Sequence, residues 1–172
     1  TSRASMVGQT SLYGYIKTRA GTRFPELFKN DTFVVSINIA KWQIWSACVS
    51  DLVIYTGSLI CREHVQTTEV RATMQSVVNL IFDTVGSPEE AGPDFKQSIE
   101  RIKNRLSSYE FDKSLDLDAI FIQSPDALVH WSPIVDELKD LDEDIVRNSI
   151  RFRWQEPRRE LRDALQVGPL MN

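Results

Sequence analysis

Three groups of side chains in this sequence have residue types that could support chemistry. Cys48, Cys61 and His64 could supply three ligands to a zinc ion, but a structural zinc site needs four and the only other histidine is His130. Cysteines in apolar surroundings are more often small core residues. We therefore expect no metal and no cofactor.

The second group follows the acidic and E-x-K order of metal-dependent nucleases, in which carboxylates hold a divalent ion beside a phosphate. It consists of Asp51, Glu69 and Arg71, with arginine in place of the lysine. Such acids need to lie on adjacent strands, whereas Glu69 falls in the first turn of a predicted helix, where a carboxylate interacts with the positive end of the helix dipole. We expect a non-catalytic protein, with a nuclease as the enzymatic alternative.

Aromatic rings form the third group. The chain has four tryptophans and four tyrosines, and two rings can hold a nucleic-acid base between them, with extra attraction when the base is cationic. Most aromatic side chains nevertheless fill cores. From the residues alone, Trp42, Trp45 and Phe82 are interpreted as core.

The elements that position these residues begin with a change in apolar periodicity. An alternating pattern predicts a strand over residues 33–39, and helical spacing then predicts a helix from Thr67 or Thr68 to a stop at Gly86. The alternating apolar residues are Phe33, Val35, Ile37 and Ile39, and the helical ones are Val70, Met74, Val77, Val78, Ile81, Phe82 and Val85.

The other segments mix strand and helix signals. Residues 12–17 and 118–123 are predicted as strands, and residues 41–53 fit either a hairpin return or a helix. Helices are expected over residues 95–107, 143–154 and 158–166, with a break at Pro157, and short helices are expected after Ser124-Pro125 and Ser132-Pro133. The pattern favours an α+β fold, in which a mixed, mainly antiparallel sheet packs against a long helix and the C-terminal third is rich in helices.

Length and composition indicate one domain. The chain has 172 residues, 42% of them hydrophobic, which is enough for one well-buried core. Residues 1–11 carry no apolar stripe and are interpreted as a tail or the edge of an excerpt, so the domain spans residues 12–172. Residues 33–61 carry only Lys41 and Asp51 as charges. Since a charge in the middle of a membrane span costs roughly 2.5–3.5 kcal/mol, we expect no membrane association. Two cysteines indicate a reducing compartment.

The net charge of −4 argues against unspecific attraction to nucleic acid. Charges are nevertheless unevenly placed, because the first 29 residues are basic, residues 136–144 are acidic, and six arginines follow between residues 147 and 162. Two readings stay open for these segments: solvated helix faces with mixed ion pairs, or a docking surface for a partner subunit or RNA.

Four segments, in order, resemble the cap-binding domain of the second basic polymerase subunit of influenza-type viruses. They are Tyr13-Gly14-Tyr15-Ile16-Lys17-Thr18-Arg19-Ala20-Gly21, Glu26-Leu27 with Asn30, Val35-Ser36-Ile37-Asn38-Ile39, and Val77-Val78-Asn79-Leu80-Ile81-Phe82. The resemblance covers residues 12–123 and indicates a thogotovirus-like orthomyxovirus as the source.

This resemblance implies a mixed α/β module of a heterotrimeric viral RNA polymerase that binds the 7-methylguanosine cap of host messenger RNA for cap snatching. Phe82 would stack on the methylated base. Trp42 would cover its other face, because Ala40 stands where influenza A has a histidine. Gln43 stands near the family's glutamate and lacks its negative charge, and the family's helix lysine has no clear counterpart. The candidate cap-site residues are Tyr15, Lys41, Trp42, Gln43 and Phe82.

The resemblance further implies the other polymerase subunits and capped host messenger RNA or viral RNA as partners, and the host nucleus and the virion as locations. The alternative is a helix-rich protein–protein interaction domain with no nucleic-acid ligand. For that alternative, the polarised charges between residues 136 and 162 would be the main functional feature.

Overall fold

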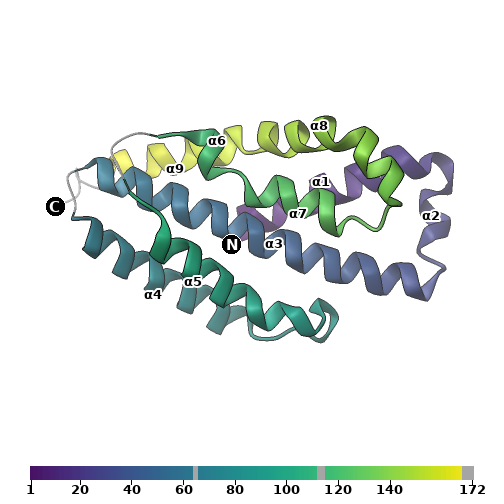
Figure 1. Ribbon diagram of the computed structural model, residues 1–172, viewed down its shortest axis with the longest axis horizontal. Helices are drawn as coiled ribbons and strands as arrows, with labels where there is room; N and C mark the ends of the chain where they lie inside the picture. The colour runs from purple at the N-terminus through teal and green to yellow at the C-terminus, as the bar shows by residue number, and fades with distance from the viewer. Residues whose placement is uncertain (64–65, 112–114, 168–172) are drawn as a thin grey trace.

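The computed structural model describes residues 1–63, 66–111 and 115–167, and every regular element in these ranges is a helix (Figure 1). The expected α+β fold with a mainly antiparallel sheet is therefore wrong: the described residues form an all-α bundle. The α-helices are α1 (Ser2–Ala20), α2 (Phe24–Leu27), α3 (Asp31–Arg62), α4 (Thr67–Val85), α5 (Ser98–Ser108), α6 (Leu117–Ile120), α7 (Gln123–Trp131), α8 (Asp136–Arg153) and α9 (Gln155–Val167), with short 3₁₀ turns at Gly21–Arg23, Glu89–Ala91 and Pro93–Gln97.

Residues 33–39, predicted as a strand, form the start of the long helix α3. Asn30 caps this helix, because its side chain accepts a hydrogen bond from the Phe33 amide at 3.1 Å. Ile37 is buried whereas Val35 is exposed, so the alternation does not mark two faces of a sheet. Other helices cover α3 on several sides. Its apolar residues are therefore spread around the axis, which weakens the helical period in the sequence.

The other two predicted strands are also helical. Residues 12–17 lie within α1, and residues 118–123 run from α6 through a turn to the first residue of α7. The Asp116 side chain caps α6 by accepting from two backbone amides. For residues 41–53, the helical alternative is confirmed. Residues 1–11, expected to be a tail, belong to α1 from Ser2 onward, with Ala4 and Val7 buried.

Several predicted helices are confirmed. The helix that was expected after Thr67 is α4, and it ends at Gly86, whose positive φ of 71° favours glycine. The helices expected over residues 95–107, 143–154 and 158–166 correspond to α5, α8 and α9. The break expected at Pro157 between the last two lies earlier, at Trp154, and Pro157 belongs to the first turn of α9, where an amide proton is not required.

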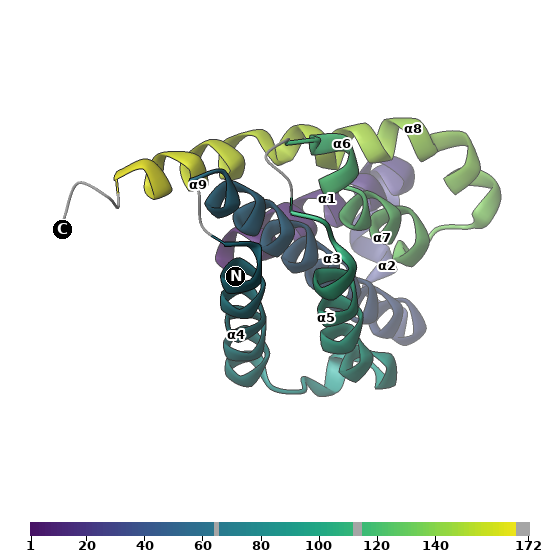
Figure 2. The same ribbon diagram turned by 60° about the vertical axis from the view of Figure 1, so that its left-hand side comes forward.

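The helices are arranged around α3. Helices α4 and α5 pack on one side of it, and α1, α7 and α8 lie on the other side (Figures 1 and 2). Helix α9 continues from the end of α8 and extends past the rest of the bundle (Figure 2). This arrangement places the ends of α8 and α9 beside α1, where the candidate site lies.

Helix α3 is long and apolar enough, by length and composition alone, to cross a membrane. Most of its apolar stretch is buried inside the bundle, which is the environment of a core helix. Asp51 lies in this stretch with a fully buried side chain, where it is paired with Arg105 from α5. The helix is therefore accounted for as the core of the fold.

Candidate functional site: an arginine-lined groove

The buried charge of the bundle is held by a network around Asp51 on α3. Arg105 of α5 donates from Nη1 to Asp51 Oδ1 at 2.7 Å, and Ser124 donates to Oδ2 through its backbone amide at 2.8 Å and its Oγ at 2.6 Å. The Gln123 amide donates to Oδ1 at 3.3 Å. Because Gln123 and Ser124 open α7, the Asp51 carboxylate caps the positive end of that helix from a neighbouring helix.

The same network extends to other parts of the bundle. Arg105 also donates to Ser50 Oγ at 3.0 Å and to the Ile120 carbonyl at 2.6 Å, and the Trp154 indole donates to Ser124 Oγ at 3.0 Å. Burial raises the pKa of Asp51, whereas the Arg105 charge and the Ser124 hydrogen bonds oppose that rise. We call this set the Asp51 network; it joins α3, α5, α6, α7 and the end of α8, and its charges are satisfied from within.

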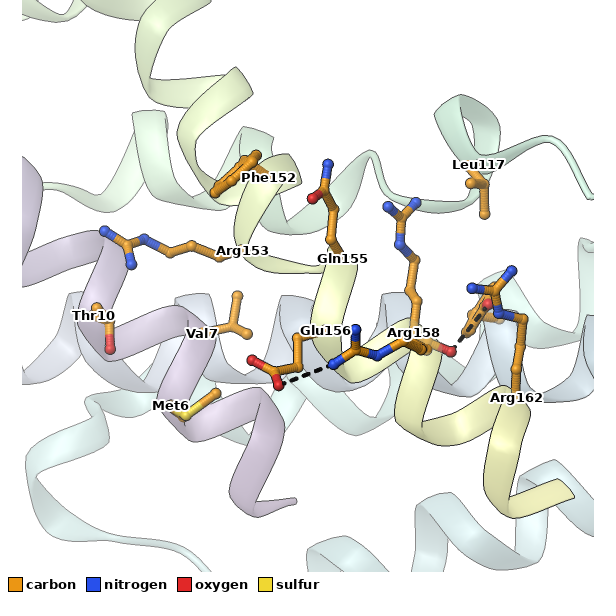
Figure 3. A pocket seen from close by; sticks show the side chains of 12 residues that line it. Met6, Val7, Thr10, Leu117, Phe152, Arg153, Gln155, Glu156, Arg158 and Arg162 are labelled. Carbon is orange, nitrogen blue, oxygen red and sulfur yellow. Dashed lines mark hydrogen bonds and ion pairs between the residues drawn. The ribbon is translucent and has the colours of Figure 1, made fainter. Parts of the chain in front are cut away.

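A second charged region lies on the surface, where a groove of about 750 Å³ runs between α1, α8 and α9 (Figure 3). Four arginines line it together with apolar side chains from three parts of the chain. We call it the arginine-lined groove, and its main lining residues are Arg153, Arg158, Arg159 and Arg162 with Met6, Val7, Leu117 and Phe152.

The corner between α8 and α9 positions these arginines. Trp154 is fully buried at this corner and Pro157 is also buried, so the two helix ends are anchored to the core. Arg158 and Arg162 follow one turn apart on α9, on the same side of the helix (Figure 3). Arg153 reaches toward α1, where its Nη2 would lie 3.8 Å from a Cβ added at Gly14.

The arginines differ in how they are held. The Arg158 Nε donates to the Trp154 carbonyl at 3.2 Å, and its guanidinium lies 5.5 Å from the centre of the Phe121 ring. Arg159 makes a 3.4 Å ion pair with Glu156, in which both side chains are largely exposed. Such a pair contributes little to stability.

Arg153 and Arg162 have neither a hydrogen-bond nor an ion-pair partner among the described residues. In the same groove, Met6 is 45% exposed and Phe152 is 68% exposed. Unpaired positive charge and exposed apolar area thus share one concave surface. An exposed apolar patch bordered by charges is typical of an interaction site.

The cap-site candidates Phe82 and Trp42 belong to an aromatic cluster between α3, α4 and the turn at Pro93–Gln97. The Phe82 ring is buried, with its centre 5.6 Å from that of Trp45 and 5.8 Å from that of Phe95. Trp42 contacts the same two rings. The structure brings Phe82 and Trp42 into one cluster, but the rings packed on Phe82 are core residues.

Lys41 and Gln43 are adjacent to Trp42 in α3 and have different partners. The Lys41 Nζ and the Trp42 indole both donate to Glu90 Oε1, at 2.8 and 2.9 Å. Gln43 is buried on another side of α3, and its Oε1 accepts from Arg101 at 2.8 Å. These three consecutive residues therefore do not converge on one cavity.

Tyr15, the fifth cap-site candidate, lies on α1 near the ion pair between Arg19 and Asp142 of α8. Burial raises the pKa of Tyr15 to about 12, and the neighbouring Asp142 carboxylate adds to the rise. The Arg19 hydrogen bond holds the pKa of Asp142 below its usual range. Tyr15 belongs to this contact between α1 and α8 rather than to the aromatic cluster.

The nuclease candidates occupy three separate environments. Asp51 is in the buried network, and Glu69 is exposed in the first turn of α4 as predicted. Arg71 donates to the backbone carbonyls of Leu106 and Tyr109, at 3.2 and 3.0 Å, and so caps the end of α5.

Metal-ligand residues are likewise not grouped in the part of the chain that the structure describes. Cys48 and Cys61 are both buried, and His64 lies outside the described residues. Within the described ranges, no group of three or more histidine, cysteine, aspartate and glutamate side chains could hold a metal ion.

The groove contains residues that sequence reasoning did not assign to a site. The arginines between residues 147 and 162 were noted as a charged segment, but Met6 and Leu117 are distant in the sequence and carry no signal of their own. No family model, curated protein or solved structure matches this chain.

Proposed function

We propose that this protein is a non-catalytic interaction module whose arginine-lined groove binds an acidic amphipathic segment of a protein partner. One observation carries the proposal: Arg153 and Arg162 have no partner among the described residues and line one groove with exposed apolar side chains, Met6 and Phe152 on the side of Arg153 and Leu117 on the side of Arg162 (Figure 3). Carboxylates of the partner would pair with the guanidinium groups, which present a planar fork of donors to them. Apolar side chains of the same segment would cover Met6 and Phe152.

The groove suits a peptide segment better than a nucleic-acid strand. Nucleic-acid binding depends on a continuous basic surface that releases counterions from the phosphates. Here Glu156 lies within the groove, Glu160 pairs with Arg3 nearby at 2.6 Å, and the whole chain has a net charge of −4. A mixed lining of arginines and apolar residues instead matches helix-in-groove recognition, where apolar anchors recur at helical spacing.

Cap binding, which the resemblance implied, stays a prediction. The strand expected over residues 33–39 is helical, and Phe82 is packed against core aromatics, so the arrangement that motivated the cap pocket is absent from the described residues. A cap analogue is nevertheless a useful competitor, because it distinguishes the two hypotheses in one assay.

Fluorescence anisotropy with a labelled synthetic peptide tests the proposal. The probe is a helical peptide with leucines on one face and glutamates on both flanks. We expect the wild-type chain to bind it and the affinity to fall as salt rises, because exposed charges are screened. The variant Arg153→Glu/Arg162→Glu should lose this binding. The control Arg23→Glu/Lys29→Glu, which makes the same charge change at exposed sites outside the groove, should keep it.

Two outcomes would contradict the proposal. One is equal peptide affinity for the wild type and the Arg153→Glu/Arg162→Glu variant. The other is a preference for 7-methylguanosine triphosphate over both the peptide and plain guanosine triphosphate, lost in Phe82→Ala, which would support a cap pocket instead.

A further inference from the structure

The first half of α8 presents an acidic and apolar surface that the bundle leaves uncovered. Glu137, Asp140 and Asp144 are exposed and have no ion-pair partner among the described residues. Between them, Leu141 is 75% exposed and Ile145 is 72% exposed. We call these five residues the acidic face.

Helical spacing makes the acidic face continuous. Glu137, Leu141 and Ile145 follow at steps of four and so lie along one line of the helix, with Asp140 and Asp144 beside it. The other acids of this segment are already paired: Asp142 with Arg19, Glu143 with Arg147 at 2.7 Å, and Asp136 with Lys139 at 3.4 Å. The acidic face is thus the part of the segment whose charge is not neutralised by described residues.

Resting on the proposed function, we infer that the segment bound by the arginine-lined groove is the acidic face of a second copy of this chain. The two surfaces are complementary in both respects that the groove requires. The exposed acids of the face offer carboxylates to the arginines of the groove, and the exposed Leu141 and Ile145 offer apolar area to Met6 and Phe152.

Geometry makes this contact intermolecular. Helix α8 has 18 residues and is therefore about 27 Å long. The acidic face lies in its first half and the groove at its end, so the face of one molecule cannot enter its own groove. Each contact between two copies joins a groove to an acidic face and leaves one of each free. Such head-to-tail contacts extend into open chains, or into rings where the rotation closes.

Sedimentation velocity on the full chain tests this inference. The wild type should form larger species as its concentration rises and should dissociate in high salt. A groove variant, Arg153→Glu/Arg162→Glu, and an acidic-face variant, Asp140→Lys/Asp144→Lys, should each be monomeric. An equimolar mixture of the two should assemble again, because the intact groove of one variant meets the intact face of the other, and the reversed charges on the two remaining surfaces are also opposite in sign.

Two controls distinguish the loss of a contact surface from the loss of folding. The variant Asp83→Lys/Glu110→Lys changes exposed acids elsewhere and should assemble like the wild type. If a charge reversal disturbs folding, as judged by circular dichroism, the milder pairs Arg153→Gln/Arg162→Gln and Asp140→Asn/Asp144→Asn replace it and should weaken assembly in the same direction.

The results distinguish failure of this inference from failure of the proposed function. A wild type that stays monomeric while still binding the synthetic peptide overturns the inference and leaves the proposed function standing. Absence of both peptide binding and assembly overturns both. Assembly that survives in either variant alone, or a mixture that does not assemble, also overturns the inference.

Discussion

The guanidinium of Arg105 and those of Arg153 and Arg162 occupy opposite environments in one small bundle. The Arg105 side chain is 11% exposed and donates to Asp51, Ser50 and a backbone carbonyl. The groove arginines are exposed, and neither has a partner among the described residues. A charged side chain whose partners are supplied by the fold itself is part of the structure. A charged side chain that lies beside exposed apolar surface and has no partner is available to a binding partner.

The largest effect on stability should come from replacing Arg105, the buried arginine. Arg105→Leu leaves the Asp51 carboxylate buried without its counter-charge, so we expect the free energy of unfolding to fall by about 3–5 kcal/mol. Urea denaturation followed by circular dichroism measures it. The double variant Asp51→Leu/Arg105→Met, which removes both charges, should recover much of the loss. A single-variant loss below about 1 kcal/mol would show that the pair is not buried as described.

A smaller loss should follow from Ser124→Ala. The hydroxyl donates to Asp51 and accepts from the Trp154 indole, so its removal leaves two buried groups short of a partner. We expect a loss of about 1–3 kcal/mol in the same denaturation experiment. Ser76→Ala, at an exposed serine of α4, is the matched control and should stay within about 0.5 kcal/mol of the wild type. Equal effects of the two substitutions would argue against a connected network.

Substitutions of the groove arginines should weaken peptide binding and leave the stability of the fold nearly unchanged. Arg153→Glu/Arg162→Glu changes exposed side chains without described partners, so the free energy of unfolding should stay within about 0.5 kcal/mol of the wild type. Peptide affinity should nevertheless weaken at least about tenfold, which corresponds to about 1.4 kcal/mol. A variant that lost stability as much as Arg105→Leu would place these arginines with the structural group.

The smallest effect concerns Tyr15, at the contact between α1 and α8. Its pKa is raised from 10.0 to about 12 in the folded chain, so folding favours the neutral phenol. The stabilisation that results is fully present below pH 10 and is lost as the pH rises toward 12. Tyr15→Phe has no such group, and its stability should fall less steeply over this interval. Parallel curves for the two proteins would mean that the Tyr15 pKa is not raised.

Helix boundaries with strong local signals could be predicted from the sequence, and the fold class could not. For α4, a single apolar stripe ending at Gly86 located the helix. For α3, burial on several sides removed the stripe, and a local alternation over residues 33–39 imitated a strand. The Asn30 cap was the available signal against that interpretation, because an asparagine followed by an acidic first turn is typical of a helix start.

The candidate site was predictable only in part. The polarised charges of residues 136–162 were visible, and with them the alternative of an interaction domain. The sequence could not predict which charged side chains form ion pairs, because ion pairing depends on tertiary neighbours. Asp142 is neutralised by Arg19 of α1, whereas Asp140, two positions earlier, is exposed to solvent. The apolar part of the groove was hidden for the same reason, since Met6 and Leu117 reach it from distant segments.

The most direct test of the account follows the arginine side chains themselves. In an NMR titration with the synthetic acidic peptide, the Nε–Hε resonances of Arg153 and Arg162 should shift, whereas that of Arg105, held by Asp51, should not. Groove resonances that stay in place while the peptide binds elsewhere, or an Arg105 resonance that shifts as much as theirs, would contradict the division between satisfied and available charge.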